Sequence, residues 1–351
     1  MELQKIIEKI EPLDETYRKK SAKKWNSIAK PLHSLGKLEE DVMKIAGMIR
    51  DENVRIDKKA LLIMCADNGV VAEGVTQTGQ EVTAIVAENF LRGDTSAAIM
   101  CKSAGVDICP VDVGMVSDTK VSARKCSYGT KDMLKGPVMT RAQAEETILT
   151  GIQLVQEKKN EGYQILATGE MGIGNTTTSS AVSSVLLGLP IEVMTGRGAG
   201  LTSAGLDRKI QVIRQAIEKN KPDPSDPVDV LSKVGGYDLA GLTGIFLGGA
   251  IYHIPVVIDG FISAVAALLA VRICEYAKDY MIASHVSKEP GMHLVLKELG
   301  LSPALTCDMC LGEGTGAVAF LPVLSMAVDV YQKMSTFSDI EIEDYEELGD
   351  K

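Results

Sequence analysis

Residues 164–178, QILATGEMGIGNTTT, carry the pattern that decides the fold. The first seven residues form a short apolar run that ends on the carboxylate of Glu170, which is typical of a buried parallel strand. Residues 171–178 then supply Gly172, Gly174 and a series of polar side chains that opens a helix through about Leu187. A strand, a glycine-rich turn and a helix in direct succession predict one unit of an α/β fold.

The same alternation continues on both sides of this stretch. Helical patterns occupy about 81–91, 140–158, 203–220, 261–277 and 293–299, with Thr78 and Thr140 as cap residues for the first two. Strands alternating with helices predict an open parallel sheet that is covered by helices on both faces. Further strand candidates lie at Ala60–Asp67, Val106–Val113, Pro255–Asp259 and Tyr280–His285.

Four of these strand candidates end on a polar residue: Asp67, Glu170, Asp259 and His285. Ligands of open parallel sheets bind outside the carboxyl ends of the strands, so we expect these side chains to converge on one pocket. Each of them could instead cap a helix.

The ends of the chain differ from this alternating region. Residues 1–55 are charged and helical in pattern, and residues 338–351 form an acidic tail that we expect to be solvated or disordered. A chain of 351 residues exceeds the usual size of one core, so we expect a large domain with a smaller satellite.

Composition excludes several classes of protein. A hydrophobic fraction of 45% is that of a soluble globular protein, and a net charge of −10 without a dense basic cluster argues against a nucleic-acid partner. Seven scattered cysteines and an N-terminus without an apolar signal region predict reduced thiols in the cytoplasm. The nearly uncharged stretch Gly241–Cys274 is interpreted as a helix, a buried strand and a second helix, not as a membrane span.

One carboxylate stands among three glycines in residues 311–317, LGEGTGA. Glycines let the backbone approach a ligand closely, so Glu313 is held where a substrate could reach it. The alternative is a helix start whose acidic residue suits the macrodipole.

Two glycine loops suggest a phosphate site. Residues 171–178 and 196–200 (GRGAG) differ from the P-loop and dinucleotide motifs, but helix N-termini with Asn175 and Thr176, together with Lys209, could bind an anion. The alternative is a pair of tight turns. The pair Cys307 and Cys310 has no partner at metal-binding spacing, so we expect a buried apolar role for it and no metal site.

Several motifs in order resemble one family of enzymes, the nicotinate-nucleotide:base phosphoribosyltransferases that activate the lower ligand of cobamides (vitamin B12). The resemblance covers residues 20–330. It rests on residues 34–39 (SLGKLE), 67–75 (DNGVVAEGV), 80–83 (QEVT), 136–140 (GPVMT), 169–177 (GEMGIGNTT), 196–200, 289–291 (EPG) and 311–316 (LGEGTG).

This resemblance implies a fold, a division into domains and a reaction. It implies a Rossmann-like sheet domain over residues 56–321, a small helical domain from residues 1–55 and about 322–351, and a dimer of identical or related subunits. The reaction moves phosphoribosyl from nicotinate mononucleotide to an aromatic base, giving an α-riboside phosphate and nicotinate. No cofactor or metal is implied.

The resemblance also implies roles for individual residues. Glu313 is expected as the general base, Glu170 as a carboxylate that stabilises positive charge on the ribose, and Lys209 as a phosphate ligand. The substrate-binding residues that we expect are Gly172, Gly174, Asn175, Thr176, Gly198, Gly200, Asp259, Ser287, Gly312, Thr78 and Val86.

Some positions depart from the family pattern. Val86 stands where members that use 5,6-dimethylbenzimidazole often carry glutamine, Thr78 where a serine can face the base, and Asn68 where histidine is common. A valine offers no amide to a ring nitrogen, so we expect phenol or p-cresol as the acceptor, with a benzimidazole or a purine as the alternative. The alternatives to a self-sufficient enzyme are a partner-dependent or non-catalytic paralogous subunit and a nucleotide-binding regulator.

Overall fold

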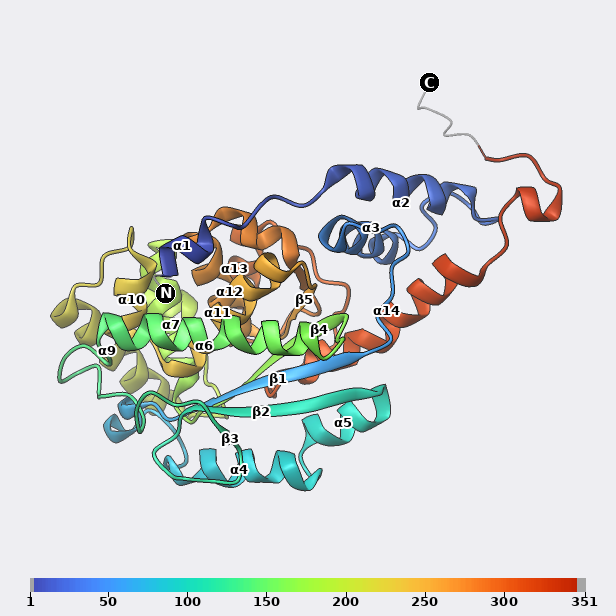
Figure 1. Cartoon of the computed structure of the whole chain (residues 1–351). Helices are drawn as coiled ribbons and strands as arrows, with labels where there is room; N and C mark the ends of the chain where they lie inside the picture. Colours follow the sequence, from blue (N-terminus) through green and yellow to red (C-terminus); the bar gives the residue numbers. More distant parts are fainter. Residues whose placement is uncertain (1–2, 346–351) are drawn as a thin grey trace.

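A six-stranded parallel sheet forms the centre of the molecule in the computed structural model, which describes residues 3–345 (Figure 1). The strand order is β3-β2-β1-β4-β5-β6, so the chain reverses its direction of winding between β1 and β4. This order is that of the Rossmann fold, and it confirms the predicted fold class. The strands are β1 (Lys59–Ala66), β2 (Val106–Gly114), β3 (Ser122–Ala123), β4 (Ile165–Met171), β5 (Val256–Ile258) and β6 (Met281–Ala283).

Helices cover both faces of the sheet. In Figure 1, α4 and α5 lie on one side of β1 and β2, and α6, α11 and α12 lie on the other. The helices are α1 (Leu3–Ile7), α2 (Glu15–Ser27), α3 (Lys37–Ile49), α4 (Glu81–Arg92), α5 (Ser96–Ala104), α6 (Arg141–Asn160), α7 (Asn175–Leu187), α8 (Ile191–Met194), α9 (Ser203–Asn220), α10 (Pro227–Val234), α11 (Tyr237–Tyr252), α12 (Phe261–Ile273), α13 (Met292–Leu299) and α14 (Thr315–Lys333). The short 3₁₀ turns are η1 (Gly69–Glu73), η2 (Glu275–Tyr280) and η3 (Ser338–Ile340).

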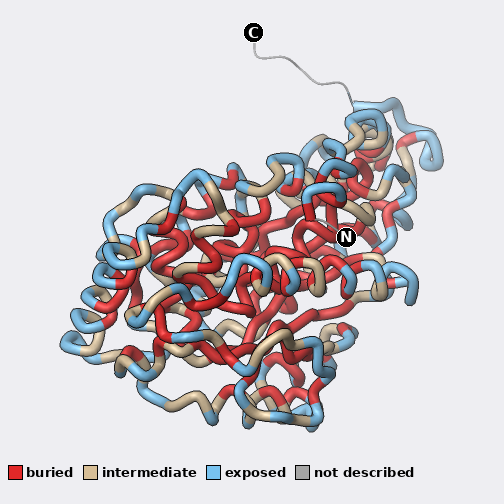
Figure 2. The backbone as a smooth tube through the Cα atoms, turned by 60° about the vertical axis from the view of Figure 1, so that its left-hand side comes forward, coloured by how far each residue is buried: buried red, intermediate tan, exposed pale blue. Residues whose placement is uncertain are grey.

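The two central strands are apolar because both of their faces are covered. Every residue of β4 and every residue of β1 after Lys59 is buried, and the buried backbone runs through the middle of the molecule in Figure 2. The nearly uncharged stretch Gly241–Cys274 forms most of α11, then β5 and α12, as predicted. Helices α6 and α11 pack so closely that a Cβ on Gly151 would lie 2.2 Å from the carbonyl oxygen of Gly241. Glycine at position 151 allows this contact.

One helix of the described chain, α14, is long and apolar enough to cross a membrane by length and composition. In this fold, 56% of the most apolar 18-residue segment of α14 is buried inside the protein. A core helix of a folded domain has the same composition, so α14 is explained by its packing.

The two ends of the chain pack together. The ring of Trp25 in α2 packs against that of Tyr331 in α14, with 4.9 Å between the ring centroids and a tilt of 50°. The Tyr331 hydroxyl donates a hydrogen bond to the carbonyl of Glu52. Helix α14 runs through Pro322 without a break, so the expected boundary near residue 322 falls inside a helix. The division into two domains stays a prediction.

Several local predictions were wrong. Thr78 does not cap α4, whose N-cap residue is Gln80, and α12 ends at Ile273, after which η2 begins. Helices α5 and α10 were not predicted. Residues 338–345 of the acidic tail are exposed, and residues 346–351 lie outside the described chain.

Candidate active site

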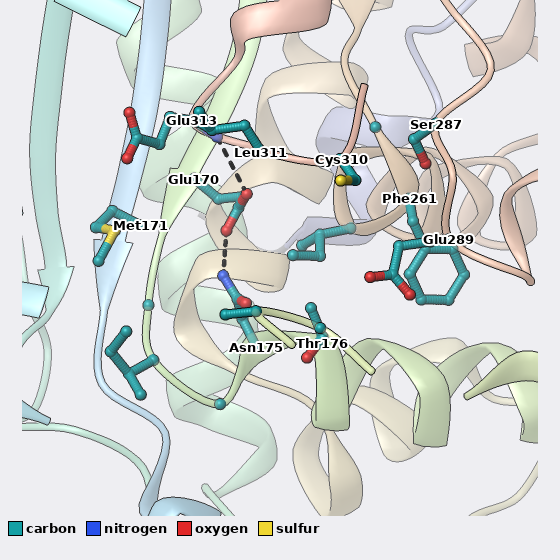
Figure 3. A pocket seen from close by; sticks show the side chains of 18 of the residues that line it. Glu170, Met171, Asn175, Thr176, Phe261, Ser287, Glu289, Cys310, Leu311 and Glu313 are labelled. Carbon is teal, nitrogen blue, oxygen red and sulfur yellow. Dashed lines mark hydrogen bonds between the residues drawn. The ribbon is translucent and has the colours of Figure 1, made fainter. Parts of the chain in front are cut away.

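A cavity of about 510 Å³ opens beyond the carboxyl ends of β4 and β5. This volume is in the range of small-molecule sites in proteins. Figure 3 shows Glu313 and Met171 at one end of the cavity and Ser287 and Glu289 at the other, with Glu170 between them. The predicted site residues that line it are Thr78, Val86, Glu170, Gly172, Gly174, Asn175, Thr176, Gly198, Lys209, Asp259, Ser287, Gly312 and Glu313.

Asp259 holds the glutamate loop in place. Its carboxylate accepts hydrogen bonds from the backbone N–H groups of Gly314 (3.1 Å), Gly316 (2.8 Å) and Ala317 (3.0 Å), at the start of α14. The carboxylate that follows β5 therefore satisfies free N–H donors at the N-terminus of α14. Asp259 lines the cavity, but its oxygens serve the backbone beside Glu313.

Glu313 occupies a left-handed backbone conformation with φ of 60°, between Gly312 (φ 88°) and Gly314 (φ 84°). Burial raises the pKa of its carboxyl group, and a backbone hydrogen bond from Ala97 opposes this effect. The Oε2 atom is buried and has no hydrogen-bond partner in the described protein. An unpartnered carboxylate oxygen at a cavity wall is a candidate proton acceptor.

Glu170 is buried in the floor of the cavity. Its Oε2 accepts a hydrogen bond from the Asn175 side chain, and its Oε1 accepts one from the backbone N–H of Glu313 at 3.4 Å. Burial raises the pKa of Glu170 to about 8, with further contributions from the nearby carboxylates of Asp238 and Asp259. In Figure 3 its carboxylate points toward Asn175, whereas that of Glu313 turns to the side on which Met171 lies.

Apolar side chains line much of the cavity. They come from the segment before α4, from α4 itself, from the end of β4 and from the loop before Glu313. The apolar lining residues of these segments include Val75, Val82, Val86, Met171, Ile173, Met309 and Leu311. Such walls favour a flat apolar ring over a charged group.

A cation and several hydroxyl groups line another part of the cavity. The Lys209 ammonium donates hydrogen bonds to Thr176 Oγ1 (2.8 Å) and to the carbonyl of Gly196 (3.2 Å). Gly198 brings its backbone beside these groups, since a Cβ there would lie 3.0 Å from Thr176 Oγ1. Burial lowers the pKa of Lys209 to about 8, and the hydroxyl oxygen of Ser287 is buried without a partner in the described protein.

Two predicted positions lie outside the cavity lining. Gly200 accepts a hydrogen bond from Gln77 through its carbonyl and does not line the cavity, although its neighbours Ala199 and Leu201 do. Asp67 was expected to join the shared pocket, but its carboxylate accepts from the backbone N–H of Val116 at 2.8 Å. The pairing of β1 with β2 shifts by one residue between Cys65 and Ala66, and β1 pairs with β4 only as far as Cys65.

Sequence reasoning missed several residues of the site. Glu289, in the Glu-Pro-Gly motif, lines the cavity, and burial raises the pKa of its carboxyl group against the opposing charge of Lys209. His285 was expected in the shared pocket as a strand end, without an assigned role, and it lines the cavity. Asp238 was not noted at all, although it is the one acidic residue between Asp229 and Asp259.

The cysteine prediction was wrong. Cys307 and Cys310 are exposed rather than buried, and Cys310 lines the cavity. All seven cysteines are free thiols. Across residues 3–345, no three His, Cys, Asp or Glu side chains are grouped so that they could hold a metal ion.

Comparison with known proteins gives a consistent result. A family model described as phosphoribosyltransferase matches residues 10–342. The nicotinate-nucleotide–dimethylbenzimidazole phosphoribosyltransferase of Ruminiclostridium cellulolyticum is 47% identical over 351 residues, which are 99% of this chain and 100% of that protein. The protein of the same name from Acetivibrio thermocellus is 48% identical and covers 96% of this chain and 95% of its own length.

Solved structures agree with the sequence relatives. The crystal structure of CobT from Thermus thermophilus superposes with a TM-score of 0.89 at 36% identity, covering 94% of this chain and all of that one.

Proposed function

Because this chain belongs to the nicotinate-nucleotide–dimethylbenzimidazole phosphoribosyltransferase family, we propose that it transfers phosphoribosyl from nicotinate mononucleotide to an apolar aromatic base. The family is shown by relatives that match the chain over its whole length, and the protein is a phosphoribosyltransferase of cobalamin biosynthesis. The products proposed here are the α-riboside phosphate of the base and free nicotinate.

One observation carries the proposal: a single cavity is lined both by a glutamate with one unpartnered carboxylate oxygen and by a separate cation. The Glu313 oxygen lacks a partner in the described protein, and Lys209 lies beside the hydroxyl of Thr176. An apolar base with a proton to lose suits Glu313, and a phosphate group suits Lys209 together with the N-terminus of α7.

The proposed phosphate site has donors from three segments. Lys209 comes from α9, Thr176 from the first turn of α7 and Ser287 from the loop after β6. We propose that the Ser287 hydroxyl, which has no partner among the described residues, donates to a phosphate oxygen. Gly198 and Gly174 let the backbone approach this site closely, with positive φ angles of 52° and 94°.

The reaction then proceeds as an inversion at the C1′ carbon of the ribose. A nitrogen or oxygen of the base attacks C1′ on the face opposite nicotinate while the bond from C1′ to the pyridinium nitrogen breaks. The leaving nicotinate takes the bonding electron pair, and Glu313 accepts the proton that the base loses. Positive charge develops on the ribose, and the ionised form of Glu170 stabilises it.

Two acceptor classes remain for the apolar part of the cavity. The named relatives favour 5,6-dimethylbenzimidazole. Val86 lines the cavity without any hydrogen-bonding group, which favours phenol or p-cresol as a second candidate. A phenol would lose its hydroxyl proton to Glu313 and attack through oxygen.

The test is a turnover assay with mass-spectrometric detection. The purified chain is mixed with nicotinate mononucleotide and an equimolar panel of dimethylbenzimidazole, adenine, phenol and p-cresol. Release of nicotinate with one new riboside phosphate supports the transfer and identifies the acceptor. V86Q is the matched variant, and it should move the preference toward the benzimidazole.

The remaining alternatives concern assembly. We propose a dimer of identical or related chains in the cytoplasm, in line with the family resemblance. Light scattering of the purified chain distinguishes a dimer from a monomer. If the chain is inactive alone and gains turnover when a related subunit from the same organism is added, the result would favour the heterodimer.

A further inference from the structure

The segment that follows β6 presents every second side chain to the cavity. Its cavity-lining residues are His285, Ser287 and Glu289. The residues between them bind the segment before Glu313 through their backbone: the N–H of Val286 donates to the carbonyl of Leu305 at 3.1 Å. The N–H of Lys288 donates in the same way to the carbonyl of Met309 at 3.0 Å. An extended segment alternates its side chains in this manner, so the backbone itself aims the histidine at the cavity.

The proton on the ring of His285 has a defined position. The hydroxyl of Ser284 lies 2.6 Å from the carbonyl oxygen of Ile258, and in this contact only the hydroxyl can donate. The same hydroxyl oxygen lies 3.0 Å from Nδ1 of His285. Because the serine donates its one proton to the carbonyl, Nδ1 carries a proton and donates it to Ser284 Oγ. In the neutral ring, Nε2 is then an unprotonated acceptor.

This acceptor nitrogen is available to a ligand. Within residues 3–345 no hydrogen bond reaches Nε2, yet Nε2 is not one of the buried atoms that lack a partner. It therefore keeps access to the cavity that His285 lines. Burial lowers the pKa of His285, and the charge of Asp259 opposes this effect. Both oxygens of Asp259 accept hydrogen bonds from the backbone at the start of α14.

The ring of His285 lies between the proposed phosphate site and the loop of Glu313. A Cβ on Gly260 would lie 3.8 Å from Ser287 Oγ and 3.9 Å from His285 Cε1, so both side chains flank this glycine. A Cβ on Gly316 would overlap the ring at Nδ1 and Cε1, so the ring rests against the first turn of α14. A nucleotide that reaches from Ser287 to Glu313 therefore passes its sugar along His285.

We propose that His285 is a specificity-determining residue whose Nε2 accepts a hydrogen bond from a ribose hydroxyl of the nucleotide. The inference rests on the proposed function, because that function places the phosphate beside Ser287 and C1′ near Glu313. A hydroxyl has a proton to donate and an unprotonated imidazole nitrogen accepts it, so the two groups are complementary. A sugar without this hydroxyl leaves the nitrogen unpaired, and the site therefore selects ribonucleotides over deoxyribonucleotides.

Two substitutions separate the roles of the two ring nitrogens. H285N places an amide N–H near the position of Nδ1, so it can still donate to Ser284 but has no acceptor at the position of Nε2. H285Q is longer and can supply a carbonyl acceptor there.

The matched control is H253N. His253 is a partly buried histidine whose pKa is also lowered by burial, and its Nδ1 lies 3.2 Å from the Tyr280 hydroxyl. It does not line the cavity. Its φ of 52° is one that asparagine adopts readily, so the control introduces no backbone strain.

The first readout is the tautomer of His285 in the full chain without substrate. The chain has four histidines, so ring-nitrogen NMR of histidine-labelled protein identifies the His285 signals by their loss in H285N. We expect a protonated Nδ1 and an unprotonated Nε2 at neutral pH. A proton on Nε2 in place of Nδ1 overturns the proposal.

The second readout is calorimetric binding of nicotinate mononucleotide and its 2′-deoxy and 3′-deoxy analogues, without an acceptor base. In the wild type and in H253N, at least one analogue should bind roughly tenfold more weakly than the ribonucleotide. H285N should lose this discrimination and H285Q should recover part of it. Full discrimination in H285N overturns the proposal. If H285N does not fold, H285Q identifies the NMR signals, and equal affinity of the wild type for all three nucleotides overturns the proposal.

The binding measurement separates this inference from the proposed function, because it needs no turnover. If H285N loses discrimination but the wild-type chain transfers nothing, the inference stands and the proposed function fails. If the wild-type chain transfers phosphoribosyl and H285N discriminates as the wild type does, the inference alone fails.

Discussion

The carboxylate of Asp259 accepts a hydrogen bond of 2.8 Å from the backbone N–H of Gly316, three residues beyond Glu313 in the chain. Together with its bonds to Gly314 and Ala317, this contact fixes the loop that carries the glutamate to the end of β5. The position of the proposed general base is therefore set by a residue that lies more than fifty positions earlier in the sequence.

Removing this carboxylate should cost both stability and activity. D259A leaves three buried N–H groups without an acceptor, and we expect a loss of about 2–4 kcal/mol in the free energy of unfolding. Urea denaturation and kcat/KM measure the two effects. D259N keeps one acceptor oxygen and should be intermediate; a D259A variant with wild-type turnover would show that the anchor is dispensable.

The substitution E313Q should abolish most of the turnover and spare substrate binding. Glutamine keeps the shape of the side chain but cannot accept a proton, so kcat should fall by roughly 10²–10⁴-fold. Calorimetric titration with nicotinate mononucleotide should give a Kd within roughly a few-fold of the wild type, because the proton is accepted only during the reaction and not when the nucleotide binds. Unchanged turnover in E313Q would contradict its role as the base and revive a nucleotide-binding regulator.

The pH dependence of stability should contain a signature of Glu170. The folded protein keeps its proton up to a pKa of about 8, whereas the unfolded chain loses it near 4.5, so the folded state binds more protons in this window. The free energy of unfolding therefore falls as pH rises through the window. E170Q should gain about 3 kcal/mol relative to the wild type between pH 6 and 9. Urea denaturation of both proteins at the two pH values measures this. If E170Q and the wild type differ in free energy of unfolding by the same amount at both pH values, the prediction is contradicted.

Nicotinate mononucleotide should bind less tightly as pH rises above about 8. Burial lowers the pKa of Lys209 to about 8, so its charge is present below that pH and is lost above it. K209M should raise the KM for the nucleotide and remove this pH dependence. The matched control is K44M: Lys44 also has a pKa lowered to about 8 by burial, but it binds the carbonyls of Lys278 and Met281, away from the cavity. A larger KM effect in K44M would argue against the phosphate site.

Gly312 should tolerate no side chain. Its φ of 88° is in the left-handed region, and a Cβ would lie 2.7 Å from Glu170 Oε1. Gly300 has a similar φ of 66° with no atom within 4 Å, so G300A isolates the backbone strain of about 1–2 kcal/mol. We expect G312A to lose more stability than G300A and, unlike G300A, to lose turnover. Equal effects in both variants would mean that Glu170 can move away from the added Cβ without loss of stability or turnover.

Local patterns in the sequence were sufficient for most of the fold. Apolar runs such as Ala60–Ala66 and Ile165–Ala167 have nowhere to lie except the centre of a parallel sheet, and the helix Ser203–Asn220 was predicted at its observed bounds. Helix α5 was missed because its nine residues carry little amphipathic pattern; its cap at Thr95 was the available signal.

The chemistry of the site was only partly readable from the chain. Strand direction alone brings the end of β4 to the edge where ligands bind, so Glu170 could be predicted from the pattern. Glu313 and Lys209 were noted beside glycine loops, and the family resemblance supplied their expected roles. Two other carboxylates needed the tertiary structure. The carboxylate of Asp67 accepts a hydrogen bond from the backbone N–H of Val116 beyond the end of β2, and Asp238 is buried beside Gly172 of the cavity lining. Sequence pattern determines which residues end a strand, whereas the burial and charge that set a pKa depend on every element packed around the group, so only the folded chain decides them.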